Sequence, residues 1–201
     1  MRVYTRAGDD GTTGLFLGGR VSKADPLMAA CGDLDEAVAV LGVARAACAA
    51  AASPRAGSAG TAGPDEGAET AELAEELLRR QRELFVVAAD LATNPAHRDR
   101  LRPGVSLVTA EMVADVERTI DAHVAARPLR PVFLVPGTTT ASAAIDHARA
   151  VVRRAERRVV ALAAAGHAVS AELTGYVNRL SDLLFVLARV AAGENEPASH
   201  D

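Results

Sequence analysis

The chain has 201 residues, of which 49% are hydrophobic and only 3% aromatic, and its formal net charge is −4. This length and apolar content can bury one substantial core, so we expect residues 1–201 to form a single domain. Few aromatic residues and abundant alanine favour closely packed helices over a β-sandwich. The slightly acidic balance gives no reason to expect nucleic acid as a partner.

The sequence shows no basic-then-apolar leader, and no apolar run is long enough to cross a bilayer. We therefore expect a cytoplasmic protein without a membrane partner. Cys31 and Cys48 have neither CxxC spacing nor a nearby histidine cluster, so we expect reduced, structural thiols. The histidines also lack metal-ligand spacing, and we assign all five to surface or packing positions: His97, His123, His147, His167 and His200.

The first predicted helix begins at Asp25-Pro26, where aspartate can cap the helix and proline can occupy its first position. It should run to about Ala51, because small and apolar residues recur at three- and four-residue steps. Its inward stripe comprises Leu27, Ala30, Leu34, Ala37, Leu41 and Ala44. Residues 53–68 are rich in glycine, serine and alanine, which predicts a flexible insertion.

A second helix is predicted from about Glu69 to near Asn94-Pro95, because a residue before proline resists helical backbone angles. Its inward residues are Leu73, Leu77, Leu84 and Val87, and a polar connector over 98–106 follows. The third helix should start at a Thr109 cap and stop before Pro128. Its inward residues are Met112, Val116, Ile120 and Val124.

The last third of the chain predicts an extended apolar segment, two helices and a tail. The segment spans 131–137, and a helix over about Ala141 to Ala165 follows, with Gly166 as its stop signal. A fifth helix starts at a Ser170 cap and uses Val177, Leu180, Leu184, Leu187 and Ala191 as its inward stripe. Residues 193–201 are predicted to fray. The fold class is therefore all-α, a five-helix bundle.

The fourth predicted helix carries a charged stripe. Asp146, Arg149, Arg153 and Glu156 lie three, four and three residues apart, so they share one face. This stripe is either a run of intrahelical ion pairs or a site where guanidinium groups hold phosphate oxygens. The remaining arginines of the helix point elsewhere, as on a solvated or subunit-facing surface: Arg154, Arg157 and Arg158. The fifth helix adds a polar patch of Asn178, Arg179 and Asp182.

The N-terminal stretch combines glycines and small hydroxyls with the only lysine of the chain, Lys23. It contains no GxxxxGK[ST] loop, and no GxGxxG follows a strand. Gly8, Gly11 and Gly14 could still let backbone N–H groups face an anion, with Thr12, Thr13 and Lys23 as additional donors. The alternative is that Asp9-Asp10-Gly11 is only a tight turn.

Taken together, these segments resemble the PduO-type ATP:corrinoid adenosyltransferases. The matching motifs occur in the family's order and cover the chain except for 53–68. They are residues 4–15 (YTRAGDDGTTGL), 20–23 (RVSK), 32–36 (GDLDE), 90–93 (DLAT), 133–137 (FLVPG), 148–157 and 176–185. Departures from the family pattern lie at Cys31, Ala37, Val38, Thr138 and Asp146.

The resemblance implies that the 5′-deoxyadenosyl group of ATP is transferred to the cobalt of a reduced corrinoid, cob(I)alamin, with release of triphosphate. It implies a homotrimer with ATP bound between subunits, Mg²⁺ as cofactor, and a flavin-type reductase as a candidate partner. A nucleotide-binding loop over 1–24 would contribute Tyr4, Thr5, Arg6, Gly8, Asp9, Gly11, Thr12, Thr13 and Lys23. A neighbouring subunit would add Arg153, Asn178 and Glu156, the last also toward Mg²⁺.

On the corrinoid side, the resemblance implies that Phe133 presses on the lower face of the corrin and that Asp35 pairs with Arg149 to fix the subunit interface. Arg153, Phe133, Asp35 and Arg149 are thus the expected catalytic set. Two other interpretations are a non-catalytic trimer that carries or senses a corrinoid or nucleotide, and a plain helical interaction module. The second of these would leave Lys23 and the charged stripe without a purpose.

Overall fold

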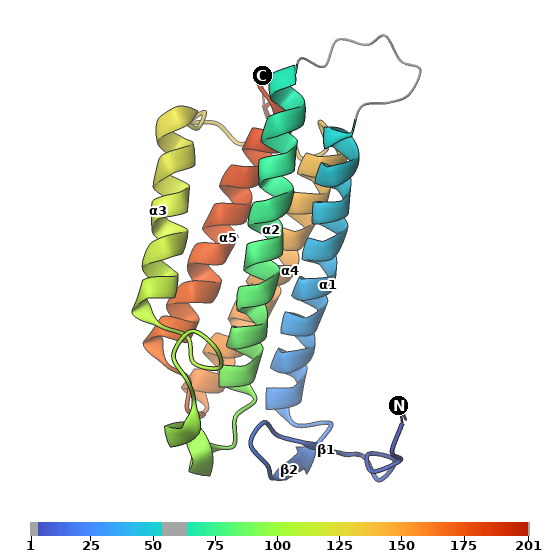
Figure 1. Cartoon of the computed structure of the whole chain (residues 1–201), viewed down its shortest axis with the longest axis vertical. Helices are drawn as coiled ribbons and strands as arrows, with labels where there is room; N and C mark the ends of the chain where they lie inside the picture. The colour runs from blue at the N-terminus through green and yellow to red at the C-terminus, as the bar shows by residue number, and fades with distance from the viewer. Residues whose placement is uncertain (1–3, 54–63, 201) are drawn as a thin grey trace.

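The computed structural model describes residues 4–53 and 64–200. Its helices lie side by side along the long axis of the molecule, and a small hairpin covers one end (Figure 1). The described elements are β1 (Thr12–Gly14), β2 (Arg20–Ser22), α1 (Pro26–Ala52), α2 (Pro64–Leu91), the 3₁₀ helix η1 (Pro95–Arg100), α3 (Ala110–Ala126), α4 (Thr140–Ala164) and α5 (Ala171–Ala192). The predicted all-α bundle is confirmed, with η1 and the hairpin as unpredicted additions.

The predicted caps explain where the helices begin. The side chains of Asp25, Thr109 and Ser170 accept hydrogen bonds from the backbone N–H groups of Leu27, Met112 and Leu173. At α4 the cap is Thr139, which forms a capping box with Ser142. Each side chain satisfies a donor that the helix itself leaves free.

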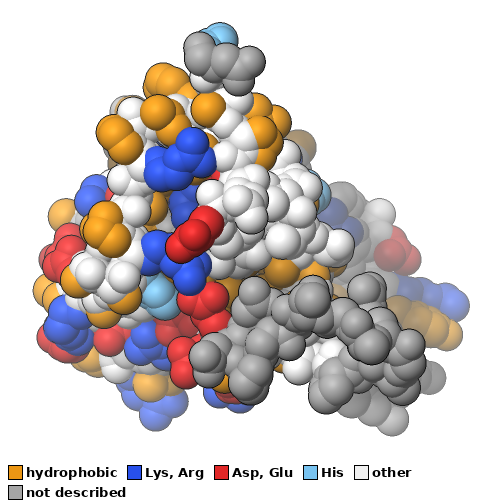
Figure 2. Space-filling model, turned by 90° about the horizontal axis from the view of Figure 1, so that it is seen from above, with side chains coloured by type: hydrophobic (Ala, Val, Ile, Leu, Met, Phe, Trp, Pro, Cys, Tyr) orange, Lys and Arg blue, Asp and Glu red, His pale blue; other side chains and the backbone are white. Residues whose placement is uncertain are grey.

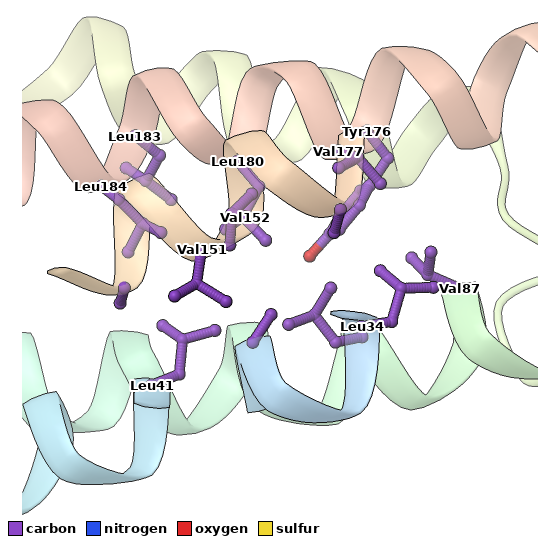
Figure 3. Close-up of a cluster of buried hydrophobic side chains, with 14 of the residues drawn as sticks. Leu34, Leu41, Val87, Val151, Val152, Tyr176, Val177, Leu180, Leu183 and Leu184 are labelled. Carbon is purple, nitrogen blue, oxygen red and sulfur yellow. The ribbon is translucent and has the colours of Figure 1, made fainter. Parts of the chain in front are cut away.

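The core lies where α1, α4 and α5 meet, with α2 alongside (Figure 3). The predicted stripe of α1 is buried in full, and Cys48 continues it. Leu41 of α1 faces Val151 of α4, and α5 closes the cluster from the other side. On α3 only Val116 is fully buried, while Met112 and Ile120 are partly buried and pack against the core.

The second helix differs most from its prediction. It begins at Pro64, so residues 64–68 of the predicted insertion are helical, while 54–63 lie outside the described residues. It ends at Leu91, earlier than expected, because Asn94 caps η1 instead of closing α2. η1 therefore occupies the start of the predicted polar connector.

A buried charge cluster that we did not predict joins α2 to α3. Arg80 is wholly buried, and its guanidinium contacts Glu76 at 2.7 Å, Glu83 at 2.6 Å and Asp115 of α3 at 3.0 Å. Tyr176 of α5 donates its hydroxyl to Glu83 at 2.6 Å, and burial raises the pKa of Tyr176 well above its ordinary value. A buried guanidinium needs such carboxylate partners, because an unpaired charge in the interior is very costly.

The predicted fraying of the C-terminal tail is wrong for residues 194–200, whereas Asp201 lies outside the described residues. Leu134 and Ala198 form an antiparallel bridge, so the predicted extended segment 131–137 holds the tail in place. Among the described helices, none is both long and apolar enough to cross a membrane.

Candidate functional site

The N-terminal hairpin folds around Lys23. The Lys23 ammonium donates to the Gly8 carbonyl at 2.8 Å, and its backbone N–H donates to the Gly11 carbonyl at 2.8 Å. A Cβ atom at Gly8 would lie 3.1 Å from Lys23 Nζ, so glycine leaves room for the ammonium there. Because Lys23 is exposed and an ammonium has three donors, it keeps donors free for an anion.

The segment before β1 forms a tight turn. Such a turn is compatible with either interpretation of this stretch, a loop that faces an anion or a turn alone. Asp10 Oδ1 accepts from the Thr12 N–H at 2.9 Å and the Thr12 hydroxyl at 2.8 Å, and these bonds lower the pKa of Asp10. Gly11 has a φ of +80°, which glycine adopts without strain. Arg20 Nε donates to Thr12 Oγ1 at 2.9 Å and fastens β2 to the turn.

The other predicted loop residues lie on the same exposed stretch. The Arg6 guanidinium lies over the Tyr4 ring, 5.9 Å from its centroid. Thr5 and Asp9 are exposed, and Thr13 lies within β1. The structure therefore places the predicted set together in one loop, and residues 1–3 of that prediction lie outside the described chain.

The loop is fixed to the end of α2. Phe16 N–H donates to the Ala92 carbonyl at 2.9 Å, and Asn94 N–H donates to the Phe16 carbonyl at 3.0 Å. Asn94 also donates its side-chain amide to the Gly18 carbonyl at 3.0 Å. These bonds hold the hairpin at the end of the bundle where α1 begins (Figure 1).

The charged stripe of α4 is divided into two parts. Toward the start of the helix, Arg149 Nε donates to Asp146 Oδ1 at 3.0 Å. Further along, Asn178 of α5 donates its amide to Glu156 Oε1 at 2.8 Å. Between them Arg153 is exposed, and no described residue forms a hydrogen bond or ion pair with its guanidinium. Of the two interpretations, a run of intrahelical ion pairs thus applies only to Asp146 and Arg149.

Two arginines that we expected on a solvated or subunit-facing surface instead join α4 to α1. Arg154 forms ion pairs with Asp33 at 3.2 Å and with Glu36. Arg158 lies 3.6 Å from the same Asp33 carboxylate. Arg157 and Arg158 are nevertheless both exposed, as predicted, and the Arg157 guanidinium donates to the Arg153 carbonyl.

A hollow of about 450 Å³ lies beside the first part of the stripe. Phe133 lines this hollow. Its side chain is 85% exposed, which is unusual for a large apolar residue. Phe185 of α5 lines it too, with Arg149 and Arg189 stacked over its ring at 5.9 Å and 5.1 Å from the centroid. The hollow therefore combines apolar faces with guanidinium groups.

The hollow lies at the end of the bundle that carries the chain's C-terminus, where hydrophobic and charged side chains are mixed on the surface (Figure 2). The Lys23 hairpin lies at the opposite end (Figure 1). Arg154 of α4 meets Asp33 and Glu36, which lie about 10–15 Å along α1 from its first residue. Among the described residues, no hydrogen bond or ion pair joins Lys23 to Arg153.

The predicted pairing of Asp35 with Arg149 is not formed within the chain. Asp35 is exposed, no described residue is its partner, and Arg149 is paired with the buried Asp146. Since we predicted this pair between subunits, it stays a prediction. Among the described residues no three His, Cys, Asp or Glu side chains gather as a metal site, so Glu156 could give a metal only one carboxylate.

Sequence reasoning missed several residues of these sites. Phe185 directly follows Leu184 of the predicted inward stripe, and an aromatic residue just off the core face was a usable signal. Arg20 appeared only within a matching motif and was given no role. For Arg189 there was no signal, because Asp146 belongs to another helix and Glu196 to a tail that we expected to fray.

Comparisons with known proteins agree with this geometry. A family model described as cobalamin adenosyltransferase matches residues 3–191. A corrinoid adenosyltransferase of Citrobacter freundii is 36% identical over 192 residues, which cover 94% of each chain. One of Mycobacterium tuberculosis H37Rv is 38% identical over 195 residues, 94% of this chain and 88% of the relative.

Solved structures give the same result. A variant PduO-type ATP:corrinoid adenosyltransferase of Lactobacillus reuteri, complexed with cobalamin and ATP, superposes with a TM-score of 0.78 at 28% identity, covering 98% of this chain and 97% of that one. The fold and the site define the protein as an enzyme of the adenosyltransferase class. The chain belongs to the cobalamin adenosyltransferase family and is of the PduO type.

Proposed function

We propose that this protein transfers the 5′-deoxyadenosyl group of ATP to the cobalt of cob(I)alamin, giving adenosylcobalamin and triphosphate. The observation that carries the proposal is the order of three residues along one face of α4. Arg149 lines the Phe133 hollow, Arg153 follows one turn later, and Glu156 is held by Asn178. Arg149 and Glu156 are separated by about 10 Å along the helix axis, which suits two substrates bound side by side.

The chemistry needs little from the protein beyond alignment and charge. Cobalt(I) attacks C5′ of the ribose, so a Co–C bond forms as the C5′–O bond breaks and its electron pair leaves with triphosphate. Cobalt is itself the nucleophile, which removes the need for a Ser, Cys or His nucleophile. The exposed, unpaired Arg153 is free to stabilise the leaving oxygens, and loss of one such donor costs about 10²–10³ in rate.

The hollow provides the corrinoid side. Phe133 offers an apolar ring where a lower ligand of cobalt would otherwise approach, with Phe185 beside it. An apolar surface cannot coordinate cobalt and keeps water away. The metal is then held without a lower ligand, which makes it easier to reduce to Co(I).

The ATP site is completed by a second copy of the chain in a homotrimer. Supporting this, the exposed Lys23 and Arg153 form no contact with each other among the described residues of one subunit. The exposed Asp35, which lacks a partner in its own chain, then reaches Arg149 of a neighbour and competes with Asp146 for it. Symmetric assemblies of this kind are the rule for soluble oligomers.

Magnesium is compatible with the residues present. Mg²⁺ usually keeps several waters and takes one or two carboxylates together with substrate phosphates. Glu156 offers one carboxylate, held by Asn178 at 2.8 Å, and the triphosphate would supply the other oxygens. When bound, the ion would neutralise charge on the leaving group.

We place the protein in the cytoplasm, where its free cysteines Cys31 and Cys48 stay reduced and a flavin-type reductase can supply the electron for Co(I). The function is tested by mixing the protein anaerobically with ATP, Mg²⁺ and chemically reduced cobalamin, and following the absorbance change of Co–C bond formation. Arg153→Ala should abolish turnover, while Arg157→Ala, on the same helix, should retain it. ATP binding without any alkylated cobalamin would instead indicate a non-catalytic carrier or sensor.

A further inference from the structure

The segment 194–200, which we call the strap, crosses the end of the bundle and pairs with the Phe133 segment. Val135 N–H donates to the Pro197 carbonyl at 2.9 Å, and Ser199 N–H donates to the Phe133 carbonyl at 2.8 Å. Arg130 donates to the Glu196 carbonyl at 2.7 Å. Among the described residues, the Val135 and Ser199 bonds are the only hydrogen bonds that the backbone of 131–137 forms. The strap is thus what holds this backbone.

A buried ion cluster fastens the strap to the helices. Glu196 is only 5% exposed, and its Oε2 lies 3.1 Å from Arg189 Nε of α5. Arg189 also contacts Asp146 of α4, which in turn holds Arg149 at 3.0 Å. The two carboxylates balance the two guanidinium groups, so each member depends on the others for its charge partner. Such a cluster is costly to break by removing one member.

The exposure of Phe133 makes this fastening relevant to the reaction. A side chain that is 85% exposed is not positioned by the packing of the core. Its place is therefore set by its backbone, and its backbone is set by the strap. The same cluster contains Arg149 and Arg189, whose guanidinium groups stack on Phe185, so it orients both aromatic rings of the hollow.

We propose that Glu196 is a positioning residue for the corrinoid: through Arg189 and the strap it fixes Phe133, and with it the coordination of cobalt. The proposal rests on the proposed function of the hollow. Glu196 is assigned no role in ATP binding, because Glu156 and Asn178 hold each other independently of Arg189.

The test compares Glu196→Gln with Glu194→Gln. Both remove one carboxylate from the strap, but Glu194 is exposed and forms no ion pair among the described residues. Glu196→Gln should raise the KM for cobalamin on the order of tenfold and leave the KM for ATP unchanged. It should also lower the four-coordinate fraction of bound cob(II)alamin in its absorption or EPR spectrum, while Glu194→Gln matches the wild type.

Hydrogen exchange provides a readout that needs no activity. The Val135 and Ser199 amides should exchange faster in Glu196→Gln than in Glu194→Gln, by about the same factor for both amides. Where Glu196→Gln does not fold, Ser199→Pro takes its place, because it removes the N–H that donates to the Phe133 carbonyl and keeps Glu196 beside Arg189; it should show the same KM split. Equal exchange in the two glutamine variants, or a normal cobalamin KM in Ser199→Pro, would overturn the proposal. If the wild type forms no adenosylcobalamin, the proposed function fails while the exchange result still decides the role of Glu196.

Discussion

Asn178 of α5 donates its side-chain amide to Glu156 of α4 at 2.8 Å, one turn from the unpaired Arg153. The bond joins two helices and leaves the second carboxylate oxygen of Glu156 without a protein partner among the described residues. This makes Asn178 the support of the proposed nucleotide site.

Replacing Asn178 by alanine should therefore weaken ATP binding. A hydrogen bond to a charged group contributes about 1.5–3 kcal/mol, so the Kd for MgATP should rise by about tenfold or more. Calorimetric titration measures it, with Thr174→Ala on the same helix as control, since within the described chain that hydroxyl bonds only the Ser170 carbonyl. Unchanged ATP affinity in Asn178→Ala would remove this pair from the site.

If the ATP site is shared between two subunits, mixing two inactive variants should restore part of the activity. Lys23→Ala and Arg153→Ala should each be inactive, because one damages the loop and the other damages α4. Random mixed trimers contain some sites with an intact loop from one subunit and an intact α4 from its neighbour. About a quarter of the wild-type activity should return after unfolding and refolding the two variants together. No recovery, with mixed trimers verified by mass spectrometry, would place both residues in one subunit's site.

Phe133 should matter for activity and not for folding. Phe133→Ala removes little buried surface, so unfolding free energy should change by less than about 0.5 kcal/mol, whereas Leu180→Ala should cost about 2–5 kcal/mol. The adenosylation rate should nevertheless fall. Phe85→Ala serves as the control, because Phe85 is also exposed, at 62%, but lies outside the hollow. A stable Phe133→Ala enzyme with a normal rate would contradict our reading of the hollow.

Alkaline pH should destabilise the fold through the buried Cys48. Burial raises its pKa from 9.0 to about 11. Below pH 9 the thiol is protonated in both states, but between these values only the unfolded chain ionises. Stability should thus fall as pH rises through this window, by about 2–3 kcal/mol for this thiol. Urea unfolding at both ends of the window should show a flatter dependence for Cys48→Ala, and an identical slope would refute the assignment.

The elements that the sequence predicted well are those with local causes. Caps at Asp25, Thr109 and Ser170 and the apolar stripe of α1 depend on residues within a few positions of each other. The family motifs also indicated Lys23 and Asn178 as site residues, and their role stays a prediction; in the structure Lys23 bonds to Gly8 and Asn178 to Glu156.

What failed depends on contacts between separate elements of the fold. The tail was expected to fray because its composition is polar, yet Glu196 finds Arg189 and the strap finds residues 133–135. Arg80 lies on the inward face of α2, in register with Leu77 and Leu84, and Glu76 and Glu83 pair with it one turn away on the same helix. Helical periodicity could have indicated this much, but not the third partner, because Asp115 belongs to α3 and meets Arg80 only once the helices are packed.

The most direct test of adenosyl transfer is a paired measurement in one anaerobic reaction of the protein with MgATP and cob(I)alamin. Alkylated cobalamin is followed by its absorbance, and the nucleotide products are separated by chromatography. We predict that adenosylcobalamin and triphosphate appear in equal amounts and that no ADP forms. Release of ADP, or bound ATP with no Co–C bond formed, would contradict the assignment.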